Sequence, residues 1–173
     1  MPQNRYDRAL MSEPLPDLLD VDRLALRGAR LEGRFAIARF DRLRDMVAEP
    51  DGEVVFALRF YRDSEGRTRI AGTIAGRVVL VCQRCLQPVE QGLAAEMDLV
   101  ALAEERDLSQ VPAEAEPLLT GGEPVRLIDL IEDEAILALP IVAFHNQCTA
   151  PDRPVPVSFG GEVSPFAVLK RDR

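Results

Sequence analysis

The sequence predicts an α+β domain in which an antiparallel sheet of about four or five strands carries a short buried helix. Three long segments in succession alternate apolar and polar residues and are joined by short turns, as in a β-meander with one wet face. A strongly apolar helical segment follows and ends at Pro140. Strands and helices do not alternate as in βαβ units, and we find no internal repeat.

The composition indicates a single acidic domain with an aliphatic core. The chain has 173 residues, of which 47% are hydrophobic and 5% aromatic, with no tryptophan and a net charge of -8. An acidic surface repels phosphate groups, so a basic protein suits this chain better as a partner than naked nucleic acid. No apolar run approaches the roughly 20 residues of a membrane span. The polar first residues contain no apolar signal region, so we expect a cytoplasmic protein.

We expect three parts along the chain. Residues 1–13 are polar and predict a flexible N-terminal tail, and residues 14–145 form the α+β domain. Within this domain, residues 103–122 are acidic and contain prolines and a Gly-Gly pair, which predicts a loop excursion. Residues 146–173 form a proline-rich C-terminal tail, whose apolar group around Phe166 is expected to dock on the body.

Four segments have the apolar alternation of strands: residues 31–37, 53–62, 70–82 and 89–102. Gly72 and Gly76 interrupt the third of them and indicate bends or a bulge. Residues 124–127 suit a further short strand. Asp41 is a suitable N-cap for a second, small helix over residues 42–49.

The main helix is predicted over residues 130–139. Asp129 is placed as its N-cap, and Glu132 lies three residues further on, at the spacing of a capping box. Glu132 and Asp133 fall in the first turn, where the helix dipole favours acidic residues. Because apolar residues cover most of its circumference, this helix should be largely buried, and Pro140 prevents its continuation.

Glu134 falls within the apolar arc of this helix. A buried carboxylate is costly unless it is paired or reaches water. Either the helix tilts so that Glu134 reaches solvent, or Glu134 forms an ion pair with Arg84, which lies in the predicted turn after the third strand.

All three cysteines and the only histidine lie in two short segments. Cys82 and Cys85 form a Cys-x-x-Cys turn, and His145 and Cys148 form a His-x-x-Cys segment after the main helix. Together they supply the ligand types of a tetrahedral zinc site. The alternative is two small side chains at a turn, with an unrelated histidine and thiol in a flexible segment. A redox dithiol is disfavoured because such motifs open a helix, whereas Pro88 and a strand follow here.

Three segments resemble the YceD family, the large ribosomal RNA subunit accumulation proteins. They are Val-Cys-Gln-Arg-Cys-Leu-Gln-Pro at 81–88, the acidic and apolar stretch at 128–140 with His145, and Ser-Pro-Phe-Ala-Val-Leu-Lys at 164–170. The last contains Pro165 and Phe166, and has Ser164 where the family usually has asparagine. In order and spacing, the resemblance spans roughly residue 30 to the C-terminus.

The resemblance implies a bacterial or plastid factor for synthesis, processing or stability of large-subunit (23S) ribosomal RNA, and hence for ribosome biogenesis. It implies no catalytic activity, and some members lack the Cys-x-x-Cys pair. The sequence agrees, because it contains no phosphate-binding glycine loop or nucleophile elbow, and one histidine leaves little for acid–base catalysis. We therefore expect a non-enzymatic assembly factor that acts through a basic ribosomal protein or maturation factor. The alternative is a zinc- or thiol-dependent module that binds ribosomal RNA directly.

Overall fold

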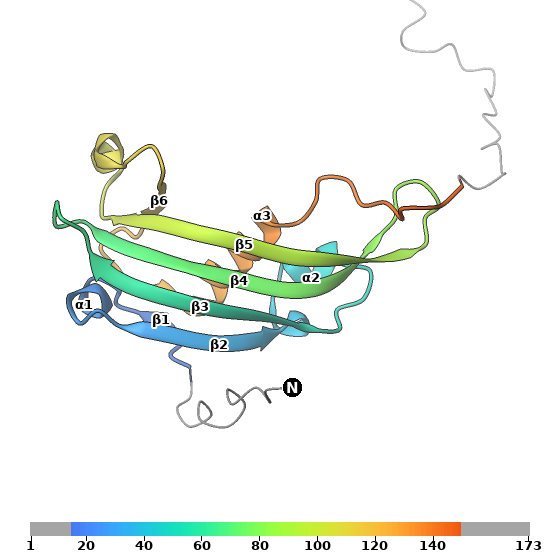
Figure 1. Ribbon diagram of the computed structural model, residues 1–173. Helices are drawn as coiled ribbons and strands as arrows, with labels where there is room; N and C mark the ends of the chain where they lie inside the picture. The colour runs from blue at the N-terminus through green and yellow to red at the C-terminus, as the bar shows by residue number, and fades with distance from the viewer. Residues whose placement is uncertain (1–14, 150–173) are drawn as a thin grey trace, which may run out of the picture.

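A computed structural model describes residues 15–149 and confirms the α+β fold. A five-stranded sheet in the order β2-β3-β4-β5-β6 forms one layer, and α3 lies behind it in Figure 1. A separate two-stranded ribbon pairs β1 with β7. The strands are β1 (Leu18–Leu19), β2 (Arg30–Ala36), β3 (Glu53–Arg62), β4 (Thr68–Val81), β5 (Pro88–Leu102), β6 (Glu116–Leu119) and β7 (Val125–Arg126). The helices are α1 (Val21–Leu26), α2 (Leu43–Met46) and α3 (Leu127–Leu137), with 3-10 turns η1 (Ile37–Arg39) and η2 (Glu105–Gln110).

The predicted meander is confirmed for β2 to β5, which pair antiparallel in chain order. Every second residue of β3 is buried from Val54 to Phe60, as the alternation predicted. The fifth strand differs from the prediction, because β6 pairs parallel to β5 and makes the sheet mixed. Residues 103–122, expected to be a loop, thus contain η2 and β6. A four-residue edge strand is too short for its alternation to stand out in an acidic segment.

Gly72 and Gly76 mark close backbone approach, and the expected bulge is absent from the β3–β4 pairing. The register between these strands runs without a break from Val54↔Gly76 to Arg62↔Thr68. A Cβ atom at Gly72 would collide with the carbonyl oxygen of Ala57, and one at Gly76 would lie 2.8 Å from that of Glu53. These positions therefore require glycine because a side chain would meet the neighbouring strand.

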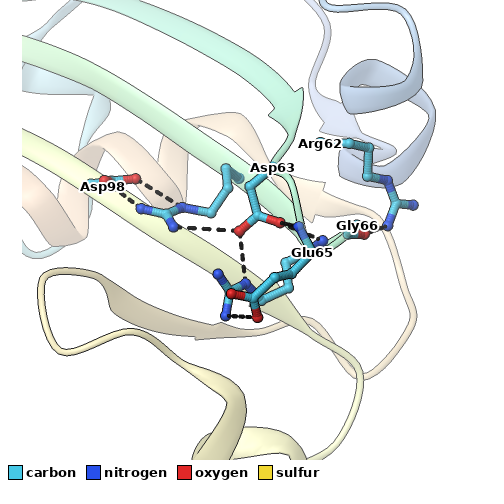
Figure 2. A network of polar contacts seen from close by, with 7 residues as sticks. Arg62, Asp63, Glu65, Gly66 and Asp98 are labelled. Carbon is cyan, nitrogen blue, oxygen red and sulfur yellow. Dashed lines mark hydrogen bonds and ion pairs between the residues drawn. The ribbon is translucent and has the colours of Figure 1, made fainter.

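A network of ion pairs fixes the β3–β4 hairpin (Figure 2). The Asp63 carboxylate accepts hydrogen bonds from the backbone N–H groups of Glu65 (3.0 Å) and Arg67 (2.9 Å) and from Nε of Arg67 (2.7 Å). Arg69 lies between Asp63 and Asp98, whose Oδ1 is 3.1 Å from the Arg69 Nε. Burial raises the pKa of Asp63, but these donors outweigh it and lower the pKa below its ordinary value. The network thus links the turn to β5 with its buried charges paired.

Helix α3 begins earlier than predicted, and its capping is different. Its first residue is Leu127, whose N–H donates to the carbonyl of Asp17 (3.0 Å). The capping box is therefore wrong: Asp129 lies in the first turn, where its carboxylate contacts Arg126 (3.1 Å). Asp17 directly precedes β1, so the pairing of β1 with β7 places the Asp17 carbonyl at the start of α3. The spacing of residues within the helix cannot reveal this long-range contact.

Glu132 caps a different helix from its own. Its carboxylate accepts hydrogen bonds from the N–H groups of Arg42 (2.6 Å) and Leu43 (3.0 Å) and from Nε of Arg42 (3.0 Å). These N–H groups stand at the start of α2, where Asp41 was predicted to be the N-cap. Asp133 contacts the same guanidinium at 2.6 Å. Glu132 therefore fastens α3 to α2, which covers one end of the core.

No helix within residues 15–149 has both the length and the apolar character needed to cross a lipid bilayer. The N-terminal tail and the apolar group around Phe166, including Pro165, lie outside the described residues.

Candidate metal centre

The structure brings together the two segments that carry the cysteines and the histidine. Cys82 and Cys85 lie in the turn between β4 and β5, and His145 and Cys148 lie in the segment that follows α3. The four ligand atoms all lie within 4.8 Å of one another, and Cys82 is buried. This group can hold a metal ion. Two turns about 60 residues apart thus form one cluster.

Two distances between ligand atoms are close to the edges of a tetrahedral zinc site. The Sγ atoms of Cys82 and Cys148 are 3.7 Å apart, and Sγ of Cys85 is 3.3 Å from Nδ1 of His145. Ligands at about 2.3 Å for sulfur and about 2.0 Å for nitrogen give tetrahedron edges of roughly 3.5–3.8 Å. Three sulfurs and one imidazole are also the ligand types that zinc favours. The residue types therefore fit zinc, and these two distances lie near the values that a bound ion would require.

A hydrogen bond fixes which nitrogen of His145 is available as a ligand. Nε2 of His145 lies 2.9 Å from the carbonyl oxygen of Pro88. Because a carbonyl only accepts hydrogen bonds, Nε2 must carry the proton. In the neutral imidazole Nδ1 then has a free lone pair, and it faces Cys85. Metal-bound histidines commonly have such a partner on the second ring nitrogen.

The backbone of the Cys-x-x-Cys turn favours a thiolate at Cys82. Burial raises the pKa of this thiol, but N–H groups of Cys85, His145 and Arg84 and the ring of His145 outweigh burial and lower it to about 5. The pKa of Cys148 is raised, because burial disfavours its thiolate and Cys82 and Cys85 lie close to it. Several thiolates can share so small a space only beside a cation, which a divalent metal supplies.

Polar contacts dock the segment after α3 onto the turn. The N–H of Gln83 donates to the carbonyl of Ala143 (2.9 Å), and Nη1 of Arg84 donates to the carbonyl of Cys148 (3.2 Å). The Arg84 guanidinium also lies over the ring of Phe144, 5.2 Å from its centre. The predicted pair between Arg84 and Glu134 is therefore wrong, because Arg84 contacts the segment that carries Phe144 and Cys148.

Glu134 is a buried carboxylate without an ion-pair or hydrogen-bond partner in residues 15–149. Only 9% of its surface is exposed, yet no fully buried side-chain oxygen in the described residues lacks a hydrogen-bond partner, so the Glu134 carboxylate keeps a narrow contact with solvent. Burial raises its pKa, and repulsion from Glu116 and Asp133 adds to the effect. Ionisation of Glu134 therefore destabilises the folded state.

Replacing Glu134 with glutamine is expected to raise the free energy of unfolding at pH 7 by up to about 1 kcal/mol, because a neutral amide loses less hydration on partial burial than a carboxylate does. The folded-state pKa is raised, so the gain should vanish as pH falls below 4.5, where glutamate is protonated in both states. Urea unfolding at several pH values measures it, with the exposed Glu123→Gln as the neutral control. A loss of stability in Glu134→Gln would reveal a favourable partner and contradict this assignment.

Pro140 lies beyond the last helical residue, Leu137, as its role as a terminator requires. Sequence reasoning missed two residues at this end of the molecule. The first is Arg42, whose guanidinium forms ion pairs with the carboxylates of Glu132 and Asp133. The second is Leu86, which follows the second cysteine directly and adopts a left-handed conformation with φ 61°. No local pattern marks the partner of Arg42, since it lies 90 residues away. Positive φ favours glycine, so a leucine gives no sign of this conformation in the sequence.

Comparisons with known proteins identify relatives of this chain. A family described as large ribosomal RNA subunit accumulation protein YceD matches residues 70–170. A protein of Haemophilus influenzae with the same name is 30% identical over 164 residues, which cover 90% of this chain and 94% of that protein. No solved structure gives a significant match. The match to the family includes all four residues of the cysteine–histidine cluster.

Proposed function

The chain belongs to the YceD family, and on that premise we propose that it supports the accumulation of large-subunit ribosomal RNA as a non-enzymatic factor. The observation that carries this proposal is the relative of that name, which aligns over 90% of the chain. The factor would act in the cytoplasm, during synthesis, processing or stabilisation of the RNA.

Zinc would have a structural part in this function. Cys82, Cys85, His145 and Cys148 would hold the ion, which would cross-link the turn between β4 and β5 to the segment after α3. Catalytic zinc sites keep one position open for water or substrate, whereas four protein ligands close the site. The ligand set therefore supports a scaffold and gives no support to metal-assisted hydrolysis.

The partner would be a basic protein, and the effect on RNA would be indirect. The chain carries 29 acidic and 21 basic residues, so its field attracts cationic proteins and repels phosphate groups. Direct RNA binding by the zinc module is the competing mechanism. Tight binding of purified protein to large-subunit RNA at physiological salt would replace our mechanism with that one.

A deletion strain of the source organism tests the proposed function. We expect mature large-subunit RNA to fall relative to small-subunit RNA, and large-subunit precursors or fragments to accumulate. Expression of the wild-type chain should restore the ratio. An unchanged ratio of the two mature RNAs in the deletion strain would contradict the proposal.

A further inference from the structure

An apolar groove lies beside the metal centre. It has a volume of about 610 Å³ and lies between α2, the end of β4, the Cys-x-x-Cys turn and the segment from Ile136 to Ala143. Apart from Asp45 and Gln83, every side chain that lines it is apolar. The turn between β4 and β5 and the segment after α3 thus both line the groove, and both also contribute residues to the metal cluster.

The apolar side chains of this groove are unusually exposed for a folded protein. Ile141 is 96% exposed, although its carbonyl accepts a hydrogen bond from the Gln83 amide (3.3 Å) that holds its backbone in place. Leu86 is 65% exposed, and Met46 and Val81 are each about half exposed. Contiguous exposed apolar side chains on a fixed backbone mark interaction sites.

The backbone at Leu86 gives an independent reason to regard the groove as functional. Leu86 has φ 61°, a left-handed conformation, and its N–H donates to the carbonyl of Cys82 (2.9 Å). It is the only non-glycine residue with positive φ in residues 15–149. Glycine fits this conformation without strain, whereas leucine is strained and is left facing water. Such strain is typical of residues whose side chains serve binding.

We infer that this groove binds an apolar segment of a basic protein. Its only charged lining residue is the carboxylate of Asp45, and neither lysine nor arginine lines it within the described residues. Phosphate groups of RNA would therefore find no cation there. A second copy of this chain also carries a net charge of -8 and would be repelled, whereas a cationic protein would be attracted. The inference rests on the proposed function for the class of partner and adds the surface that binds it.

Site-specific cross-linking tests the identity of the partner. Full-length protein with photoreactive benzoylphenylalanine in place of Ile141 is irradiated with the RNA-free proteins of purified large ribosomal subunits. We expect a cross-link to an identified basic subunit protein, through a segment that contains apolar residues. The same group in place of Leu26, which is 73% exposed on α1 and outside the groove, should give none. Cross-links only to residues 150–173, to a second copy or to both positions alike would overturn the inference.

Titration of the identified protein then measures the contribution of the groove. Ile141→Lys and Leu86→Gly should each weaken binding at least about tenfold, as expected for buried apolar anchors at an interface. Leu86→Gly also removes backbone strain, so a loss of binding there cannot be attributed to misfolding. The control Leu26→Lys adds the same charge as Ile141→Lys and should bind like the wild type. Unchanged binding by both groove variants would overturn the inference.

The deletion strain separates the two claims. If wild-type protein restores the ribosomal RNA ratio and Ile141→Lys restores it equally, the groove is not the relevant surface and the proposed function stands. If deletion leaves the RNA ratio unchanged, the proposed function fails, whatever binds in the groove.

Discussion

Replacing Cys82 with serine is expected to abolish binding of one zinc ion per chain and to lower the free energy of unfolding by at least ~3 kcal/mol. Structural zinc contributes on the order of 10 kcal/mol in small zinc modules, where the metal replaces a core. Here a separate hydrophobic core supports the sheet, so only part of that amount should be lost. The loss should be greatest in the segment that carries His145 and Cys148, because the metal would hold it to the turn.

Metal analysis of the purified protein and denaturant unfolding check this expectation. Gln87→Ser is the matched control, since Gln87 lies in the same turn and only its backbone carbonyl takes part, accepting from the N–H of Cys82 (2.9 Å). The control should keep one zinc ion and wild-type stability. Zinc retained at full stoichiometry by Cys82→Ser would show that the cysteine is not a ligand.

Glu132→Ala is expected to cost about 2–3 kcal/mol, because it leaves two backbone N–H groups at the start of α2 without their acceptor, whereas the Arg42 guanidinium is 54% exposed and stays hydrated. The Glu132 side chain is 5% exposed and satisfies two backbone N–H groups and the Arg42 guanidinium. Its removal leaves the start of α2 uncapped, because the N-cap residue Arg42 makes no capping hydrogen bond with its own side chain. Denaturant unfolding measures the loss.

Asp133→Ala is the control for this experiment, because Asp133 contacts the same guanidinium but is 55% exposed. A solvent-exposed ion pair contributes less than ~1 kcal/mol, so the control should change stability little. Equal losses in the two variants would mean that the guanidinium contact, and not the buried cap, carries the energy.

The Glu132 contacts also predict a direction for acid unfolding. Burial raises the pKa of Glu132, but the N–H groups of Leu43 and Arg42 and the Arg42 side chain outweigh it, and the pKa lies below its ordinary value of 4.5. A depressed folded-state pKa adds stability above pH 4.5, which is lost as pH falls through the folded-state value. The stability difference between wild type and Glu132→Ala should therefore shrink below pH 4.5.

The parts of this fold that could be predicted depend on local signals. Strands β3 to β5 alternate along ten residues or more, so their faces are readable from the sequence. The cluster of Cys82, Cys85, His145 and Cys148 was foreseeable as one of two alternatives, because the ligand types and their x-x spacing suit zinc but do not show that the two segments meet. Residues that bond across long separations were not foreseeable. Glu132 has the spacing of a capping residue for its own helix, yet its carboxylate accepts hydrogen bonds from the N–H groups at the start of α2.

The error at Arg84 has the same cause. Charge alone favoured a pair with Glu134, but the turn geometry directs Arg84 to the carbonyl of Cys148 and the ring of Phe144. Glycines were read as bends because their sequence context does not reveal how closely a neighbouring strand approaches. In each case the competing partner belongs to another element of the fold.

X-ray absorption at the zinc edge of the full-length protein tests the central claim most directly, namely that two distant turns form one closed zinc site. The account predicts one zinc ion per chain, surrounded by three sulfur atoms at about 2.3 Å and one imidazole nitrogen at about 2.0 Å. A shell of oxygen and nitrogen atoms only, or protein that contains no zinc after expression with zinc supplied, would contradict it.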